Sequence, residues 1–430
     1  MDRRNFFKMM GAAGLAAMMP LGIRKSHAAP YTGPFFISIA AEGAWDVTSF
    51  CDPKMNVGGE PVINHWAQTG ETQTVSSSSI QYAPFGRNQE FFTKYRDHML
   101  VINGIDAQTN AHDAGIRHCW SGRLLPGYPS LAALAATVYG ADQPLAFLSN
   151  GGYKETAGLV PYTLMQDPST LRDLVNTNAV PWGEGTFHYQ SDLDIIEQAK
   201  QDRLTRLRAQ NNLLPAHSQN MQDLFNARAN ISQLDALQQN LPTELVSPID
   251  RDGHWNPLLQ QAQIALAAYA SGLTVSADLI IYGFDTHVDH DTEHEQDLTR
   301  LVNGLDYLWD TAEALGIAEQ LVVFVTSDFG RTPAYNDDNG KDHWPIGSAL
   351  FMQKNASWAN RVVGQTDGGH NALAINPTTL QVDSGGTLIY PMHVQEAFRE
   401  LAGIAQHEVC TQFPLTSETI DFFNPSLATS

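Results

Sequence analysis

The stretch "VVFVTSDFGRTPAYNDDNGKDHWPIG" (322–347) decides the fold class, because an unbroken apolar run passes directly into a polar loop. Such a run is typical of a strand buried on both faces, as in a parallel sheet. The loop places Asp328 at the end of the strand and the pair Asp342 and His343 a short distance on. In an open parallel sheet, ligands bind beyond the carboxyl ends of the strands. The stretch therefore predicts an α/β fold with a site at that edge.

Other segments repeat this pattern, with helical segments between them. Apolar strands are predicted at 35–40, at 99–102 and in "TVSADLIIYG" (274–283). Amphipathic helices are predicted in "NPLLQQAQIALAAYASGL" (256–273) and "LTRLVNGLDYLWDTAEALG" (298–316). Helices and strands that alternate at these lengths predict a parallel central sheet.

One segment differs in character from the rest. Residues 187–240 are rich in Gln, Leu, Ala and Arg, with apolar residues at helical spacing. We expect a helical insertion there, beside a single α/β domain that spans residues 30–430.

Composition limits the classes of partner. The chain has 430 residues, of which 43% are hydrophobic and 17% charged, enough for a large core. Its 46 acidic residues outnumber the 25 basic ones and give a formal net charge of −21. So acidic a surface repels phosphate backbones and anionic lipid, which argues against nucleic acid and peripheral membrane partners.

The first residues are typical of an export signal. Residues 1–29 contain the pair Arg3 and Arg4, an apolar stretch too short to span a bilayer, and small residues suited to cleavage. This order predicts a twin-arginine signal peptide, export by the twin-arginine translocase and a periplasmic or secreted mature protein. The alternative is an amphipathic helix with a chance arginine pair. Cleavage would remove one acidic and five basic residues, which changes the net charge from −21 to −25.

Three cysteines, Cys51, Cys119 and Cys410, show no ligand spacing. One disulfide is possible in an oxidising compartment, but buried free thiols are the favoured interpretation.

Candidate metal ligands follow several predicted strands. Asp46 follows the first strand, Asp285 and His287 follow 274–283, and Asp328 and His343 follow the opening strand. Carboxylates with imidazoles suit zinc, manganese or iron, and carboxylates alone suit magnesium or calcium. A divalent metal held there could polarise an ester or activate a water.

Two further histidines have an open role. His290 and His294 in "HVDHDTEH" have the i, i+4 spacing of a zinc pair, but solvated residues at a helix start share that spacing. A Gly-x-Ser-x-Gly nucleophile motif and a phosphate-cradling glycine loop are both absent from the sequence.

At these residues the chain resembles a known family. The motifs "GAWDVTSFCDPK" (43–54), "NAHDAGIRHCWSGR" (110–123), "GFDTH" (283–287), "SDFGRTP" (327–333) and "KDHWP" (341–345) occur in the order seen in the exported family called domain of unknown function 1501. That family belongs to the alkaline phosphatase and sulfatase superfamily. The resemblance implies a mostly parallel sheet with helices on both faces and one or two divalent metals at the strand ends. It also implies a nucleophile that opens a helix and attacks phosphate or sulfate esters.

The resemblance assigns roles to the candidate ligands. Asp46 resembles the metal aspartate of the first strand, and Asp328 resembles the carboxylate of a second site. Asp285 and His287 look like ligands of one site, with His343 as its distal histidine. Arg331, inside "SDFGRTP", is a catalytic candidate in the same motif.

Two departures from the family pattern leave the chemistry open. Phe329 stands where the superfamily often has His or Asn, which weakens the second metal site. His112 stands at the nucleophile register, and Thr109 is near but out of register. His112 is thus a catalytic candidate that could serve as metal ligand, acid or base, nucleophile or structural residue.

Two functions follow as expectations. The first is a metal-dependent hydrolase of phosphate or sulfate esters, with zinc, manganese, calcium or magnesium as cofactor and a small molecule or glycan as substrate. The second is a non-catalytic periplasmic scaffold or binding protein that keeps the fold. Convergence of the candidate ligands favours the first.

Overall fold

The computed structural model describes residues 30–141, 143–165, 178, 180, 185–208, 237, 240–241, 245–416 and 418–427. The predicted signal peptide at 1–29 lies outside this part of the chain and stays a prediction.

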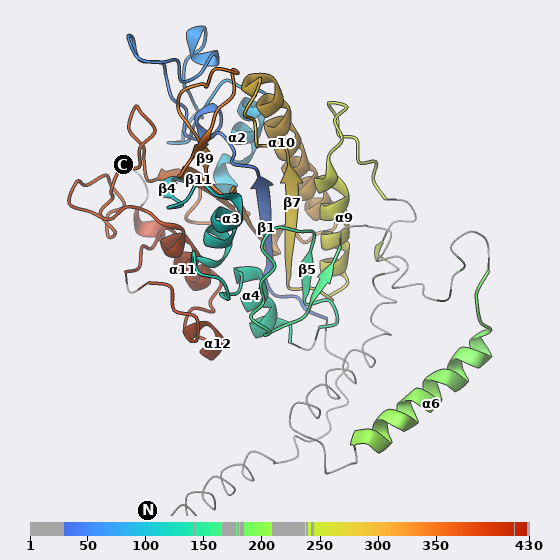
Figure 1. The fold of residues 1–430 in the computed structure, drawn as a ribbon. Coiled ribbons are helices and arrows are strands. Elements are labelled where there is room, and N and C mark those ends of the chain that lie inside the picture. Colours follow the sequence, from blue (N-terminus) through green and yellow to red (C-terminus); the bar gives the residue numbers. More distant parts are fainter. Residues whose placement is uncertain are drawn as a thin grey trace, which may run out of the picture.

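The centre of the molecule is an eight-stranded sheet with the order β12-β4-β11-β8-β1-β7-β5-β6 (Figure 1). The strands are β1 (Phe35–Glu42), β4 (Met99–Asp106), β5 (Phe147–Ser149), β6 (Tyr162–Leu164), β7 (Ser276–Tyr282), β8 (Leu321–Thr326), β11 (Ile346–Met352) and β12 (Arg361–Val363). Neighbours pair in parallel, except that β11 runs antiparallel to both β4 and β8. The predicted mostly parallel sheet is confirmed.

The direction of β11 follows from its connection to β8. Parallel neighbours need a long crossover, usually a helix. Between β8 and β11 the chain instead forms a small antiparallel pair, β9 (Gly330–Arg331) with β10 (His343–Trp344). The chain therefore returns from the same edge of the sheet, and His343 lies at the edge where β8 ends.

Helices cover both faces of the sheet, as the resemblance implies (Figure 1). Alternate residues of β1 face opposite cores: Phe35, Ile37 and Ile39 lie in one cluster and Phe36 in the other. The first cluster includes α2 (Asn88–Tyr95), α9 (Pro257–Ala270) and α10 (His290–Ala314). On the other face lie α3 (His112–Ser121), α4 (Leu131–Tyr139) and α11 (Pro391–Leu401).

Several smaller elements complete the fold. They include η1 (Val47–Ser49), β2 (Gln73–Thr74), β3 (Gln81–Tyr82) and α12 (Glu408–Thr411), and a longer helix, α6 (Gln190–Arg208), follows β6 in the chain. Helix α6 is mostly exposed and lies within the predicted insertion at 187–240, most of the rest of which is outside the described residues. The division into one domain with an insertion stays a prediction.

Two expectations about local structure can be settled. Helix α10 begins at His290, well before the predicted start at 298, so His290 and His294 lie in its first turns. All three cysteines are buried and free, as the favoured interpretation expected. Within the described part of the chain, every helix is too short or too polar to cross a membrane.

Candidate functional site

The carboxyl ends of three parallel strands place polar side chains at one edge of the sheet. The segment after β4 leads to His112, the first residue of α3. The loop after β7 bears Asp285 and His287, and the turn after β8 bears Asp328. His343 reaches the same edge from β10.

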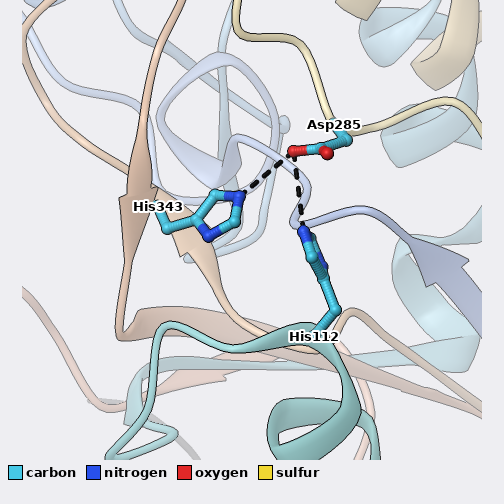
Figure 2. Close-up of side chains that lie close together, drawn as sticks. All are labelled: His112, Asp285 and His343. Carbon is cyan, nitrogen blue, oxygen red and sulfur yellow. Dashed lines mark hydrogen bonds and ion pairs between the residues drawn. The ribbon is translucent and has the colours of Figure 1, made fainter.

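Three of these residues form a compact group. Figure 2 shows the rings of His112 and His343 both directed at the carboxylate of Asp285. His343 Nε2 lies 3.2 Å and His112 Nε2 lies 3.6 Å from Asp285 Oδ1. Each of the three offers a ligand atom within 4.8 Å of the others, which makes them a group that could hold a metal ion.

His287 stands beside this group. Its Nε2 atom lies 3.0 Å from Asp285 Oδ1 and 3.0 Å from His343 Nε2. Three imidazole nitrogens thus surround one carboxylate oxygen. The structure brings together four of the predicted residues: His112, Asp285, His287 and His343.

The other nitrogen of each imidazole is held by an acceptor. An acceptor at Nδ1 keeps the proton of a neutral imidazole there and leaves the lone pair on Nε2. The acceptors are a carboxylate oxygen of Asp328 for His112, Asp342 Oδ1 at 2.9 Å for His287, and the carbonyl oxygen of Asn110 at 2.8 Å for His343. Metal-binding histidines in proteins are oriented in this way.

The group fits a divalent cation. His112 Nε2 is buried and has no hydrogen-bond partner, so its lone pair points at other acceptors without a donor between them. Tetrahedral bonds of the length zinc makes to nitrogen and oxygen put ligand atoms about 3.3 Å apart. Four of the separations here run from 3.0 Å to 3.6 Å, and the ligand atoms of His112, Asp285 and His343 all lie within 4.8 Å of one another. Imidazole donors also suit zinc or manganese better than magnesium or calcium.

Arg331, predicted as a catalytic residue, is fully buried in the structure. All five of its N–H groups point at acceptors within the protein, so none is left for a substrate. The acceptors are the carbonyl oxygens of Gly43, Ala44 and Lys341, a carboxylate oxygen of Asp285 and Nε2 of His287. Arg331 is therefore placed to position Asp285.

The charge of Arg331 also sets the ionisation of Asp285. Burial by itself opposes ionisation, but the hydrogen bond and charge of Arg331, with His343 and His112, lower the pKa of Asp285 to about 2. Asp285 is thus a carboxylate at neutral pH, as a metal ligand must be.

Asp328 acts on the group through His112. Its second carboxylate oxygen accepts from the Ala44 N–H at 2.7 Å and from Ser327 Oγ at 2.8 Å. Helix α3 approaches this turn closely because residue 115 is glycine: a Cβ there would lie 2.6 Å from the Asp328 carbonyl oxygen. The hydrogen bond with Asp328 raises the pKa of His112 above its usual value.

Asp46, predicted as a ligand, is placed outside the group. Its carboxylate is fully buried and pairs with Lys341 Nζ at 2.6 Å and His290 Nε2 at 3.0 Å. Burial opposes ionisation of Asp46, but Lys341 and then His290 hold its pKa well below the usual range. A lysine thus neutralises the carboxylate that was expected to bind a metal.

His290 and His294 belong to the same buried cluster. Both are fully buried, so neither is a solvated residue of a helix start. His290 Nδ1 lies 2.6 Å and His294 Nδ1 lies 3.2 Å from Thr286 Oγ1, and His294 Nε2 accepts from the Asp46 N–H at 2.7 Å. With every ring nitrogen hydrogen-bonded inside the protein, the structure places the pair away from the metal-type group.

The role of Lys341 was not predicted from the sequence, and Asp342 was not included among the candidate site residues. A signal was present: in the extended segment "KDH", neighbouring side chains point to opposite sides. Such alternation directs Lys341 and His343 away from the side that Asp342 takes. Lys341 nevertheless turns into the protein, which its charge alone does not predict.

A side-chain nucleophile is missing from the contacts of the group. Among the described residues, those that hydrogen-bond to His112, Asp285, His287 or His343 include no Ser, Thr or Cys side chain. Thr109, the nearest candidate in sequence, uses its Oγ1 to accept from the Ala111 N–H at 3.2 Å.

Comparison with known proteins identifies a family. Residues 36–383 match the family described as "Protein of unknown function (DUF1501)". No curated protein matches the chain.

Solved structures match the chain at low sequence identity and low TM-score. A protein of glycosaminoglycan metabolism from Bacteroides thetaiotaomicron is 9% identical, with a TM-score of 0.43 over 93% of this chain and 78% of that one. The lipoteichoic acid synthase LtaP from Listeria monocytogenes is 9% identical, with a TM-score of 0.36 over 94% and 79%. The PsFucS1 sulfatase from Pseudoalteromonas sp. is 12% identical, with a TM-score of 0.34 over 83% and 70%.

Proposed function

The chain belongs to the DUF1501 family, as its motifs predicted, and we propose that it is a metal-dependent hydrolase of phosphate or sulfate esters. The observation that carries this proposal is the convergence of imidazole lone pairs on Asp285 Oδ1, with every Nδ1 atom held by an acceptor. Arg331 donates to the same oxygen and to His287 Nε2, but the lone pairs of His112 and His343 still face Asp285, and a divalent cation bound there would stabilise that arrangement.

Some of these residues would bind the ion, and others orient the side chains that bind it. Asp285, His343 and His112 would hold the ion, with His287 beside them. A divalent ion bound there supplies a Lewis acid and lowers the pKa of a coordinated water. Asp328 and Asp342 orient His112 and His287, and Arg331 orients Asp285. Because no hydroxyl or thiol of the described residues joins the group, we propose direct attack by water without a covalent enzyme intermediate.

The charge around the group bears on how an anionic ester would bind. In the part of the chain that the structure describes, Arg331 is the basic side chain that hydrogen-bonds to the group, and all its N–H groups are engaged. Asp285, Asp328 and Asp342 add negative charge. An ester anion would therefore be repelled by the protein alone, and its binding depends on the ion.

The proposed setting is outside the cytoplasm. The twin-arginine motif supports export through the twin-arginine translocase to the periplasm or the medium. Small-molecule or glycan esters are the substrates proposed for that setting.

Hydrolysis can be measured on the mature protein after chelation and reconstitution with Zn²⁺ or Mn²⁺. Release of 4-nitrophenol from its phosphate and sulfate esters should require the ion. Asp285→Ala and His343→Ala should lower kcat/KM by about a hundredfold or more, because each removes a direct ligand. Asp337→Ala removes an exposed carboxylate nearby in sequence and should leave it unchanged. Tight metal binding without turnover of any ester would favour the scaffold alternative.

A further inference from the structure

A second polar cluster lies beneath the proposed metal site and centres on a buried ion pair. Asp46 and Lys341 have fully buried side chains, with Oδ2 and Nζ 2.6 Å apart. Desolvating two charges is costly, and the cost is offset only when good geometry and further hydrogen bonds satisfy both groups. The role of the cluster can therefore be inferred from the other hydrogen-bond partners of Lys341.

The ammonium group of Lys341 is enclosed by oxygen atoms. Besides Asp46 Oδ2, it donates to Asn64 Oδ1 at 3.1 Å and to Thr48 Oγ1 at 3.3 Å, which uses all three of its N–H groups. The ring of Tyr335 lies 5.0 Å from Nζ. A carboxylate, an amide and a hydroxyl oxygen are the ligands that hard cations take in proteins. The ammonium thus occupies the place that a cation would take.

The oxygen cage is itself rigidly held. Asp46 Oδ1 accepts from the N–H of Thr48 at 2.9 Å and from its hydroxyl at 2.7 Å. Asn64 Nδ2 donates to the Lys54 carbonyl oxygen at 2.9 Å. These bonds hold the oxygens through groups other than the ammonium, as expected of a built site.

Two chain segments run between this cluster and the metal-type group. In one, Thr286 contacts the buried histidines while its neighbours Asp285 and His287 face the group. In the other, Lys341 enters the cluster and His343 faces the group. The backbone N–H of Lys341 donates to the Thr286 carbonyl oxygen at 3.1 Å, and this hydrogen bond joins the two segments. Where Lys341 sits therefore fixes the spacing between ligands on the two segments.

We propose that Asp46, Thr48 and Asn64 form a second cation site whose resident cation is the ε-ammonium of Lys341. The filled site sets the positions of Asp285, His287 and His343. Lys341 is thus a positioning residue, and the protein binds a single divalent ion because the Asp46 carboxylate is already neutralised from within the chain. The positioning role rests on the proposed function, whereas the cation site stands on its own contacts.

Lys341→Ala tests both the cation site and the positioning role, because it removes the ammonium from among the oxygen atoms and leaves space for a small amine. Co²⁺ affinity, followed by the visible absorption of the bound ion, should fall about tenfold to a hundredfold, as for other outer-shell partners of metal ligands. Methylammonium should restore the affinity and the melting temperature, whereas tetramethylammonium at equal ionic strength should not, because it has no N–H donor and is too large. Lys354→Ala, which removes a surface lysine paired with Glu313 and Glu319, is the matched control.

If Lys341→Ala fails to fold, a variant in which both members of the ion pair are replaced by neutral residues still tests the cation site. The double variant Asp46→Asn, Lys341→Met removes both charges together and should melt higher than Lys341→Met alone, because no carboxylate is left buried without a partner. Unchanged Co²⁺ affinity and spectrum in Lys341→Ala would overturn the positioning role. Equal restoration by both amines, or a double variant no more stable than Lys341→Met, would overturn the cation site. If the wild-type protein binds no metal, the proposed function fails, and the melting temperatures still decide the cation site.

Discussion

His112 shows how one side chain can be prepared for a metal by its neighbours. Its Nδ1 atom is committed to Asp328, and its Nε2 atom is buried without a partner near Asp285. At the position that the sequence resemblance matched to a nucleophile, this chain thus offers a nitrogen lone pair. Of the roles left open by the sequence, that of metal ligand fits the contacts best.

The state of His112 predicts how metal affinity depends on pH. Its hydrogen bond with Asp328 raises the pKa of His112 above 6.5, and a protonated imidazole cannot bind a metal. Zn²⁺ affinity should therefore fall as the pH drops through this raised pKa, so that the loss begins above pH 6.5. Titration calorimetry from about pH 5 to pH 8 would measure it.

The Asp328→Asn variant tests whether the contact between Asp328 and His112 sets this pH dependence. Without the carboxylate, the pKa of His112 falls and the drop in affinity moves to lower pH, because less acid is needed to keep the imidazole neutral. Orientation of the ring also weakens, so affinity at the alkaline end should fall about tenfold to a hundredfold. Superimposable profiles for the two proteins would show that Asp328 does not act on His112.

At the scale of elements, the site depends on close packing between loops. Asn336 Nδ2 donates to the His287 carbonyl oxygen at 3.0 Å, and its Oδ1 accepts from the Gly340 N–H at 2.8 Å. A Cβ at position 340 would lie 1.7 Å from the same His287 oxygen. The loop between β9 and β10 can therefore hold the β7 loop only because residue 340 is glycine.

Gly340→Ala should consequently displace His287. Overpacking against backbone costs about 1–3 kcal/mol of folding free energy, and metal affinity should fall as well. Urea unfolding of the metal-free variant and calorimetry with Zn²⁺ would measure the two effects. Gly368→Ala, where a Cβ meets nothing within 4 Å, is the control and should change neither. A Gly340→Ala variant as stable as that control would mean that the loops are not packed as described.

The sequence predicted strands more reliably than the contacts of their loops. Apolar runs located β1, β4, β7 and β8, and the loops after them met because parallel strands share an edge. The position of Asp46 after β1 could not reveal its partner, since Lys341 comes from a distant loop. The early start of α10 was hidden by the polar run 289–297, and with it the burial of His290 and His294.

At the scale of the whole molecule, carboxylates can be neutralised in two ways, by a lysine of the chain or by a cation from solution. Together these two ways explain how so acidic a protein supports a site rich in carboxylates. Beneath the edge of the sheet, Lys341 neutralises Asp46 from within the chain. At the surface, Asp285 is half exposed and Asp342 more so, so an ion from solution can reach them. The acidic surface, with a formal net charge of −21, favours the approach of cations.

We propose that His112, Asp285 and His343 form a site for a single divalent ion. The most direct test is the metal content of the purified mature protein, measured by plasma mass spectrometry after exposure to Zn²⁺, Mn²⁺, Mg²⁺ and Ca²⁺ and removal of the unbound ions. We expect one ion per chain, zinc or manganese in preference to the others, and none in Asp285→Ala. Metal-free protein under all four conditions, or an ion retained undiminished in Asp285→Ala, would contradict it.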